Sequence, residues 1–226
     1  LMFRQLMDAI ERMENRERIE KINNELHIAN ERLQNLAVRD MLTGLYNRQG
    51  FAEELESLIH MVEVEKKRAE MSILYSDLDN FKPYNDEFGH DIGDLVLIEY
   101  ANLLKEVCGP DGYVVRYGGD EFLVIIPSVD REVVEGAAKK IFEILREERG
   151  FTDKVSKKLG RTVDIPEEKY LSCSIGISGV VLNPEDSARD KISDTIKRAD
   201  EMMYYIKKTV KHRYVFYEDV QDKLEE

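Results

Sequence analysis

The sequence predicts a mixed α/β fold of the α+β class, in which one sheet is built from strands and helices in the order βαββαβ. Two observations lead to this prediction: short aliphatic and β-branched runs typical of buried strands, and segments between them with apolar residues at helical spacing. A chain of 226 residues is long enough for one such domain and an appendage. The predicted strands occupy 72–79, 113–117, 121–127 and 170–181, and the predicted helices between them occupy 92–107 and 130–148.

Residues 1–38 contain no Pro or Gly and are predicted to form one long helix. Their apolar residues from Ile19 to Leu36 alternate steps of three and four, which is typical of a coiled-coil seam. We therefore assign 1–38 to a signalling and dimerisation coiled coil and 39–226 to a separate globular domain. A single amphipathic helix packed on its own domain is the alternative. Because the chain opens inside a helical pattern, we expect an N-terminal sensor domain to precede it.

Three further elements flank the βαββαβ unit: a charged amphipathic helix from 48 to about 68, a helix over 188–208 and a closing strand at 214–217. Residues 149–168 are polar, lack clear periodicity and end at Pro166, so they are predicted to be an irregular insertion.

The composition narrows the possible partners and the compartment. A net charge of −13 argues against binding to nucleic acid or direct contact with anionic membranes. No apolar run approaches the roughly 20 residues that a membrane span needs, and no signal peptide is visible. Cys108 and Cys173 lie in apolar surroundings and are predicted to be reduced. We expect a cytoplasmic protein, or the cytoplasmic part of a larger, membrane-bound sensor.

The stretch Arg116-Tyr-Gly-Gly-Asp-Glu-Phe122 places two adjacent carboxylates, Asp120 and Glu121, on a tight glycine turn between two predicted strands. Taken alone, the stretch could equally be an ordinary exposed acidic turn. Asp77 and Asp79 favour a functional site over an ordinary turn, because they end the first strand two residues apart and so share one face.

The expected topology brings these acids together. A βαββαβ unit tends to place its first and third strands as antiparallel neighbours at the centre of the sheet, so Asp77 should lie beside Asp120 and Glu121. Clustered carboxylates repel unless a cation neutralises them, and an all-oxygen site suits Mg²⁺ or Mn²⁺. This is the palm-like layout, related to that of nucleotidyl cyclases, that serves two-metal nucleotidyl transfer.

Residues 80–94 are predicted to form a loop that carries ligand contacts. Lys82 and backbone amides could hold a triphosphate. A carboxylate can accept from two adjacent N–H groups on the guanine edge, which adenine lacks, and an amide can complete the set. Asn85 and Asp94 are the candidates for that recognition.

These motifs together resemble the GGDEF domain of diguanylate cyclases. The resemblance extends from Asp40 to about Tyr217 and would make 39–226 a GGDEF catalytic domain. It is carried by Leu42-Thr43-Gly44-Leu45-Tyr46-Asn47-Arg48, Asp77-Leu78-Asp79-Asn80-Phe81-Lys82, Asn85-Asp86, Gly89-His90, Gly93-Asp94, the Arg116–Phe122 stretch, Ser174-Ile175-Gly176 and Ala199-Asp200-Glu201-Met202-Met203-Tyr204.

The resemblance implies a role for each matching residue. Asp77 and Glu121, with the Leu78 carbonyl, would hold two Mg²⁺ or Mn²⁺ ions, and Asp120 would lie at the metals and help to deprotonate the attacking 3′-hydroxyl. Asn85 and Asp94 would read guanine, while Lys82, Lys207 and Lys211 would contact phosphates. The implied catalytic residues are thus Asp120, Glu121 and Lys82. The implied substrate-binding residues are Asn85, Asp94, Phe81, Lys82, Lys207, Lys211 and Arg116. Phe81 would be either a wedge that fixes the loop or a platform for the base, and Arg116 either a structural or a phosphate contact.

The implied reaction joins two GTP molecules into cyclic di-GMP and releases pyrophosphate. One domain would hold one GTP, so a homodimer would be needed for turnover. A catalytically idle GTP-binding or dimerisation module is the alternative function.

Two stretches depart from the family pattern. Gly109-Pro110-Asp111-Gly112 lies where an Arg-x-x-Asp product-inhibition motif is common, and it lacks the Arg. Lys211 and His212 replace the Arg and Asn that close the last helix region, so a point charge remains without bidentate geometry.

Overall fold

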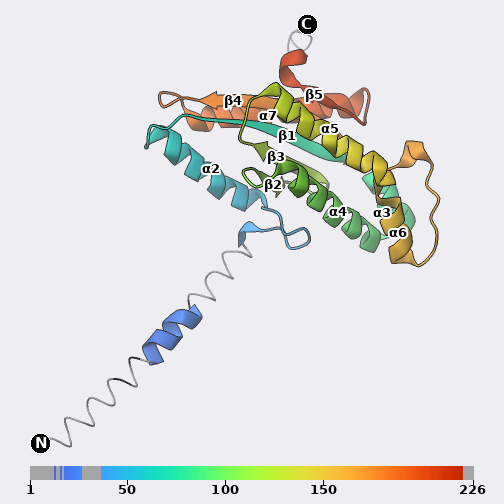
Figure 1. Ribbon diagram of the computed structural model, residues 1–226, viewed down its shortest axis with the longest axis horizontal. Helices are drawn as coiled ribbons and strands as arrows, with labels where there is room; N and C mark the ends of the chain where they lie inside the picture. The colour runs from blue at the N-terminus through green and yellow to red at the C-terminus, as the bar shows by residue number, and fades with distance from the viewer. Residues whose placement is uncertain (1–12, 14–15, 17, 27–36, 221–226) are drawn as a thin grey trace, which may run out of the picture.

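The computed structural model describes residues 13, 16, 18–26 and 37–220 (Figure 1). Residues 18–26 are helical, and Ile19, Ile22 and Leu26 are exposed there. Most of the coiled coil predicted for 1–38 lies outside the described residues, so dimerisation through it stays a prediction. None of the helices in the described part of the chain is both long enough and apolar enough to cross a membrane.

Five strands form one sheet in the order β2-β3-β1-β4-β5. The central strand β1 pairs antiparallel with both β3 and β4, as does β2 with β3, whereas β5 pairs parallel with β4. The predicted antiparallel contact between the first and third strands of the βαββαβ unit is therefore confirmed. The strands are β1 (Ala69–Asp79), β2 (Tyr113–Arg116), β3 (Glu121–Ile126), β4 (Ser172–Leu182) and β5 (Tyr214–Phe216).

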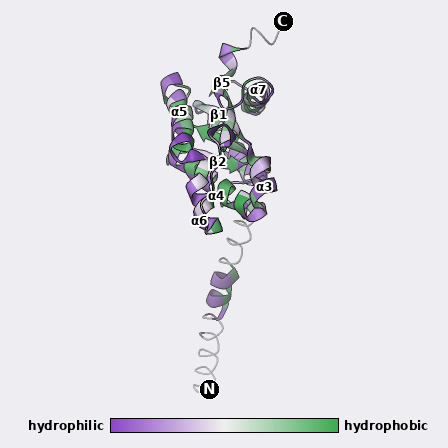
Figure 2. Cartoon of the chain, turned by 90° about the vertical axis from the view of Figure 1, so that its right-hand side faces the viewer, coloured by the Kyte–Doolittle hydropathy of each residue, from purple (hydrophilic) through white to green (hydrophobic). Residues whose placement is uncertain are grey.

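Helices cover both faces of this sheet, which lies between α5 and α7 in Figure 2. Side chains alternate along β1, so Leu74 and Leu78 pack with α4 and α5, whereas Ile73 and Tyr75 pack with α2 and α7. The hydrophobic core accordingly has two layers, one on each side of the sheet. The helices are α2 (Arg48–Glu63), α3 (Phe81–Phe88), α4 (His90–Cys108), α5 (Arg131–Glu147), α6 (Thr152–Leu159) and α7 (Ala188–Lys208).

Helix α3 occupies much of the 80–94 segment for which a loop was predicted. Asn80 leaves β1 in the left-handed conformation, with φ of 66°, and Gly89 separates α3 from α4 with φ of 85°. Pro83 is tolerated because it lies in the first turn, where backbone N–H groups have no partner inside the helix. The buried side of this short helix is formed by Tyr84, so its face toward the core was too small to be recognised from apolar spacing.

The 149–168 segment is also more regular than predicted. It contains helix α6 and two short 3₁₀ turns, Arg149–Phe151 and Glu167–Lys169. Phe151, Val155 and Ile165 are buried in the same core layer as α4 and α5. An eight-residue helix is too short to display its periodicity clearly, so the sequence read as polar loop.

We predict that Phe151→Ala lowers the free energy of unfolding by about 3–5 kcal/mol, because it removes a fully buried aromatic side chain from a packed layer. Urea denaturation would measure the change. Lys157→Ala is the matched control, since Lys157 is exposed on α6 and should change stability by less than about 0.5 kcal/mol. Equal effects of the two substitutions would contradict the packed role of this segment.

Candidate active site

The register of β1 against β3 places Asp77 directly opposite Glu121. Both residues share the alternation of Tyr75 and Leu123, so both side chains lie on the α7 face of the sheet. The Leu78 N–H donates to the Asp120 carbonyl at 3.2 Å, which joins the end of β1 to the turn. Asp77 and Glu121 are therefore neighbours across the two strands, with Asp120 next in the chain, as the expected topology predicted.

The turn between β2 and β3 is closed around Glu121. The N–H groups of Tyr117 and Gly118 both donate to the Glu121 carbonyl, at 2.8 and 3.2 Å. A side chain at Gly118 would collide with the Glu121 carboxylate. Glycine at 118 thus leaves the Glu121 carboxylate room to lie on that side of the turn.

Lys207, near the end of α7, forms an ion pair with Asp77. This contact depends on how closely α7 approaches the sheet. At Gly176 of β4, any side chain would collide with the backbone of α7 at Ala199 and Met203. Gly176 therefore lets α7 lie low enough for Lys207 to reach the central strand.

The electrostatics of the site centre on Asp77. Burial raises the pKa of the Asp77 carboxyl to about 6, and the negative charges of Asp120 and Glu121 also raise this pKa, while Lys207 opposes them. Asp77 is thus a buried carboxyl beside two other acids, and within the described residues it is paired with the Lys207 ammonium.

The donor chemistry of this end of the sheet fits a hard divalent cation. Asp77, Glu121 and the Leu78 carbonyl offer only oxygen ligands, and a cation beside Asp77 would oppose both the burial and the neighbouring charges that raise its pKa. Among the described residues, no group of three or more His, Cys, Asp or Glu side chains is gathered closely enough to form a metal site. The two-metal site therefore stays a prediction.

Arg116 is committed to contacts within the domain. Its Nη1 donates to both carboxylate oxygens of Asp40, at 3.0 and 3.1 Å, and its Nε and Nη2 donate to the Gly119 carbonyl, at 3.1 and 2.8 Å. Asp40 also accepts from the Thr43 N–H and hydroxyl. These bonds favour the structural alternative for Arg116. The sequence analysis missed Asp40 as its partner, although the Asp40–Thr43 spacing signalled a capped turn.

The candidate guanine readers lie together where α3 meets α4. The amide of Asn85 fills the space that a side chain at Gly93 would occupy, so Asn85 lies next to the backbone that precedes Asp94. Asp94 itself is exposed. Tyr84 is buried and Phe81 packs against the same core layer, as expected for wedges that fix this segment.

The remaining predicted cations lie at the edge of the site. Lys82 is exposed in the first turn of α3, and Lys211 is exposed in the loop that follows α7. Neither forms an ion pair within the described part of the chain. Their contact with phosphate stays a prediction.

Asp79 is a residue whose role the sequence analysis left open. It is fully buried, and its Oδ2 accepts from the Ser174 hydroxyl at 2.8 Å and from the His212 N–H at 3.1 Å. This position makes Asp79 a link between β1 and the loop after α7.

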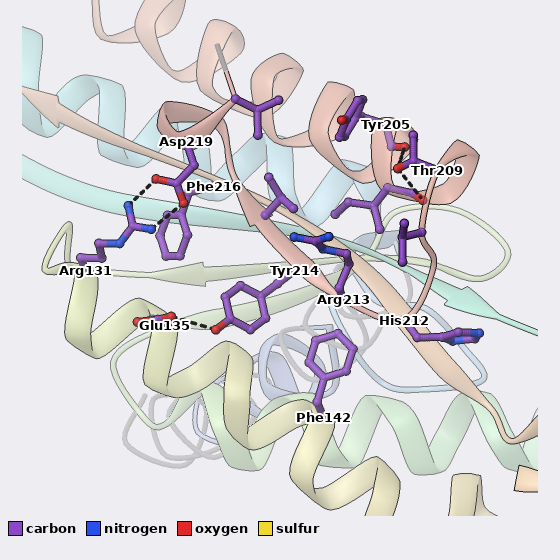
Figure 3. Close-up of a pocket in the computed structure, with 14 residues that line it drawn as sticks. Arg131, Glu135, Phe142, Tyr205, Thr209, His212, Arg213, Tyr214, Phe216 and Asp219 are labelled. Carbon is purple, nitrogen blue, oxygen red and sulfur yellow. Dashed lines mark hydrogen bonds and ion pairs between the residues drawn. The ribbon is translucent and has the colours of Figure 1, made fainter. Parts of the chain in front are cut away.

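A hollow of about 740 Å³ lies on another part of the surface, between α5, the end of α7 and β5 (Figure 3). None of the predicted site residues lines it. Arg131 bonds to Asp219 at 2.9 and 2.6 Å, and the Tyr214 hydroxyl donates to Glu135 at 2.8 Å. The hollow is therefore distinct from the carboxylate end of the sheet.

The fold and the site define a palm-like α/β domain in which carboxylates converge at one end of two central antiparallel strands. The chain belongs to the GGDEF domain family: the family model described as diguanylate cyclase, GGDEF domain, matches residues 37–213.

Relatives and solved structures agree with this assignment. The response regulator PleD of Caulobacter vibrioides is 36% identical over 177 residues, covering 76% of this chain and 34% of PleD. The cyclic di-GMP phosphodiesterase PdeR of Escherichia coli is 33% identical over 179 residues, covering 79% of this chain and 24% of PdeR. A structure of the coiled coil and GGDEF domain of DgcB from Caulobacter crescentus, in complex with c-di-GMP, has a TM-score of 0.67 at 26% identity and covers 90% of this chain and 98% of that one. The chain thus spans only about a quarter to a third of these two curated relatives.

We predict that the pKa of Asp77 falls in Asp120→Asn and rises in Lys207→Met, because the first change removes a repelling charge and the second removes the ion-pair partner. A carbon-detected NMR titration of the Asp77 carboxyl would measure both shifts. A pKa that neither substitution moves would contradict the electrostatic account.

The raised pKa of Asp77 also makes the stability of the fold depend on pH. The folded pKa of about 6 exceeds the ordinary value of 3.8, so ionised Asp77 destabilises the fold; this penalty is absent below about pH 4 and complete above pH 6.

Proposed function

We propose that this chain is a diguanylate cyclase that condenses two GTP molecules into cyclic di-GMP and releases pyrophosphate. The single observation that carries the proposal is the register of Asp77 opposite Glu121, which gathers oxygen ligands at one end of the sheet. The family supports cyclic di-GMP synthesis in general, since relatives such as VdcA of Vibrio cholerae are named diguanylate cyclases.

Different residues of the site would bind different parts of the nucleotide. Asn85 and Asp94 hold the guanine edge between α3 and α4, because a carboxylate and an amide together match its donors and acceptor. Lys82 and Lys211 oppose the charge of the phosphates. Lys207, which pairs with Asp77, completes this set of cations.

Asp77, Glu121 and the Leu78 carbonyl would hold two Mg²⁺ or Mn²⁺ ions. When bound, such ions neutralise charge at the α-phosphate and lower the pKa of a bound hydroxyl. Asp120, whose carbonyl accepts from the Leu78 N–H of β1, would take the proton of the 3′-hydroxyl.

The reaction requires two facing domains. In each half, the bond from a 3′-oxygen to an α-phosphorus forms, the bond from that phosphorus to the pyrophosphate oxygen breaks, and the hydroxyl proton passes to the base. Two such transfers give one cyclic product and two pyrophosphates. Because each domain would hold one GTP, we propose that a homodimer is the active state.

The direct experiment is incubation of the chain with GTP and Mg²⁺, followed by chromatography of the nucleotides. Cyclic di-GMP with a rate that rises steeply with protein concentration supports the proposal, because dimers must form. Binding of GTP without any product would favour a catalytically idle GTP-binding module. The Lys207–Asp77 ion pair is the observation that favours this second function, since it occupies a predicted metal ligand.

We predict that Glu121→Gln abolishes product formation and leaves the fold intact. The substitution removes a metal ligand but also relieves repulsion of Asp77, so stability should not fall. Chromatography measures the product, and thermal unfolding provides the check on folding. Glu87→Gln is a matched control, because Glu87 is an exposed acid on α3 outside the site. Full activity in Glu121→Gln would refute the metal assignment.

A second prediction concerns the choice of base. Asp94→Ser should reduce the preference for GTP over ATP by about 1–3 kcal/mol, the usual scale for loss of a charged hydrogen-bond partner. Competition between the two nucleotides in one binding assay would measure it. Asp91→Ser is the control, since Asp91 is exposed one turn earlier on α4. Unchanged discrimination would place base recognition elsewhere.

A further inference from the structure

Asp79 is a buried carboxylate that the proposed reaction does not use. Its side chain is 0% exposed, and its Oδ1 has no hydrogen-bond partner within the described residues. Burial of a carboxylate without full compensation is costly, so such a group calls for an explanation. Within the described residues its hydrogen bonds are both to Oδ2, from the Ser174 hydroxyl and the His212 N–H, and the His212 Nδ1 lies 3.4 Å from the same oxygen.

His212 adopts an unusual backbone conformation at the point where it contacts Asp79. Its φ is 64°, in the left-handed region that non-glycine residues seldom occupy. The bond from its N–H to Asp79 is 3.1 Å long, and the next residue, Arg213, accepts from the Ile175 N–H at 3.0 Å. The loop 209–213 is thereby joined to β1 on one side and to β4 on the other.

The opposite side of this loop has little packing to hold it. Thr209, Val210, His212 and Arg213 line the hollow of about 740 Å³, as Figure 3 shows for the three of them that it labels. Val210 is 60% exposed. Thr209 is bonded to the carbonyls of Tyr205 and Ile206 at the end of α7, and beyond it the loop is attached to the sheet through its polar contacts.

We propose that Asp79 is a positioning residue that fixes the 209–213 loop against β1, and so sets where Lys211 lies relative to the phosphates of the nucleotide. Lys211 lies within the loop, whereas Lys207 belongs to α7 and is held by that helix. The inference rests on the proposed function. It predicts that loss of the contact weakens recognition of the phosphate chain and leaves recognition of guanosine unchanged, because Asn85 and Asp94 lie on other elements.

The test compares two probes by calorimetry in Mg²⁺: GMP, and a GTP analogue with a methylene group between the α and β phosphorus atoms. In Asp79→Ala, affinity for the triphosphate should fall at least about tenfold, while affinity for GMP stays within about twofold. Ser174→Ala is the matched control, since it removes another bond to Asp79 without touching the loop, and it should leave both affinities unchanged.

A pair of variants at His212 tests the same contact if Asp79→Ala does not fold. His212→Gly keeps the N–H and accepts a positive φ, so it should bind both probes normally. His212→Pro deletes the N–H and excludes that φ, so it should reproduce the selective loss.

Equal weakening of both probes, or no weakening, in Asp79→Ala or His212→Pro would overturn the inference. If the unsubstituted chain binds neither probe, the proposed function itself fails, which is a distinguishable result.

Discussion

The antiparallel register of β1 and β3 is the constraint on which the site depends. It sets Asp77 opposite Glu121, and the alternation of side chains turns both toward α7. A shift of one residue would send one carboxylate into the apolar layer beneath α4 and α5. The many apolar residues of β1 and β3 that pack on both faces therefore hold the register and, with it, the acidic end of the sheet.

Contacts of two basic side chains, Lys207 and Arg116, stabilise this acidic end of the sheet. The close approach of α7 at Gly176 brings Lys207 to Asp77, where its charge offsets part of the burial and repulsion that raise the pKa of that carboxyl. Arg116 ties the glycine turn to Asp40, and so links the hairpin to the segment that enters the domain. The site is thus a place where charges are held close together by the surrounding fold.

Elements with strong local signals could be predicted from the sequence. The strands, the glycine hairpin and helix α7 follow from apolar runs, turn residues and long helical periodicity, and the topology rule then places Asp77 beside Glu121. Helices α3 and α6 escaped prediction because eight residues give about two turns, too few for a clear period.

The contacts of individual side chains were not predictable in the same way. Arg116 meets Asp40 across 76 positions of the chain, and Asp79 meets His212 across 133. Such pairs depend on the packed tertiary structure and leave no local pattern. For this reason Arg116 could be either a phosphate contact or a structural residue on sequence grounds, whereas its bonds favour the second.

The most direct test of the account is a crystal structure of the chain with Mn²⁺ and a GTP analogue that cannot react, with anomalous scattering used to locate manganese. The account predicts manganese at about 2.0–2.3 Å from the carboxylate oxygens of Asp77 and Glu121, with guanine against Asn85 and Asp94. Manganese bound away from these carboxylates, or nucleotide bound while the Lys207–Asp77 pair persists without metal, would contradict it.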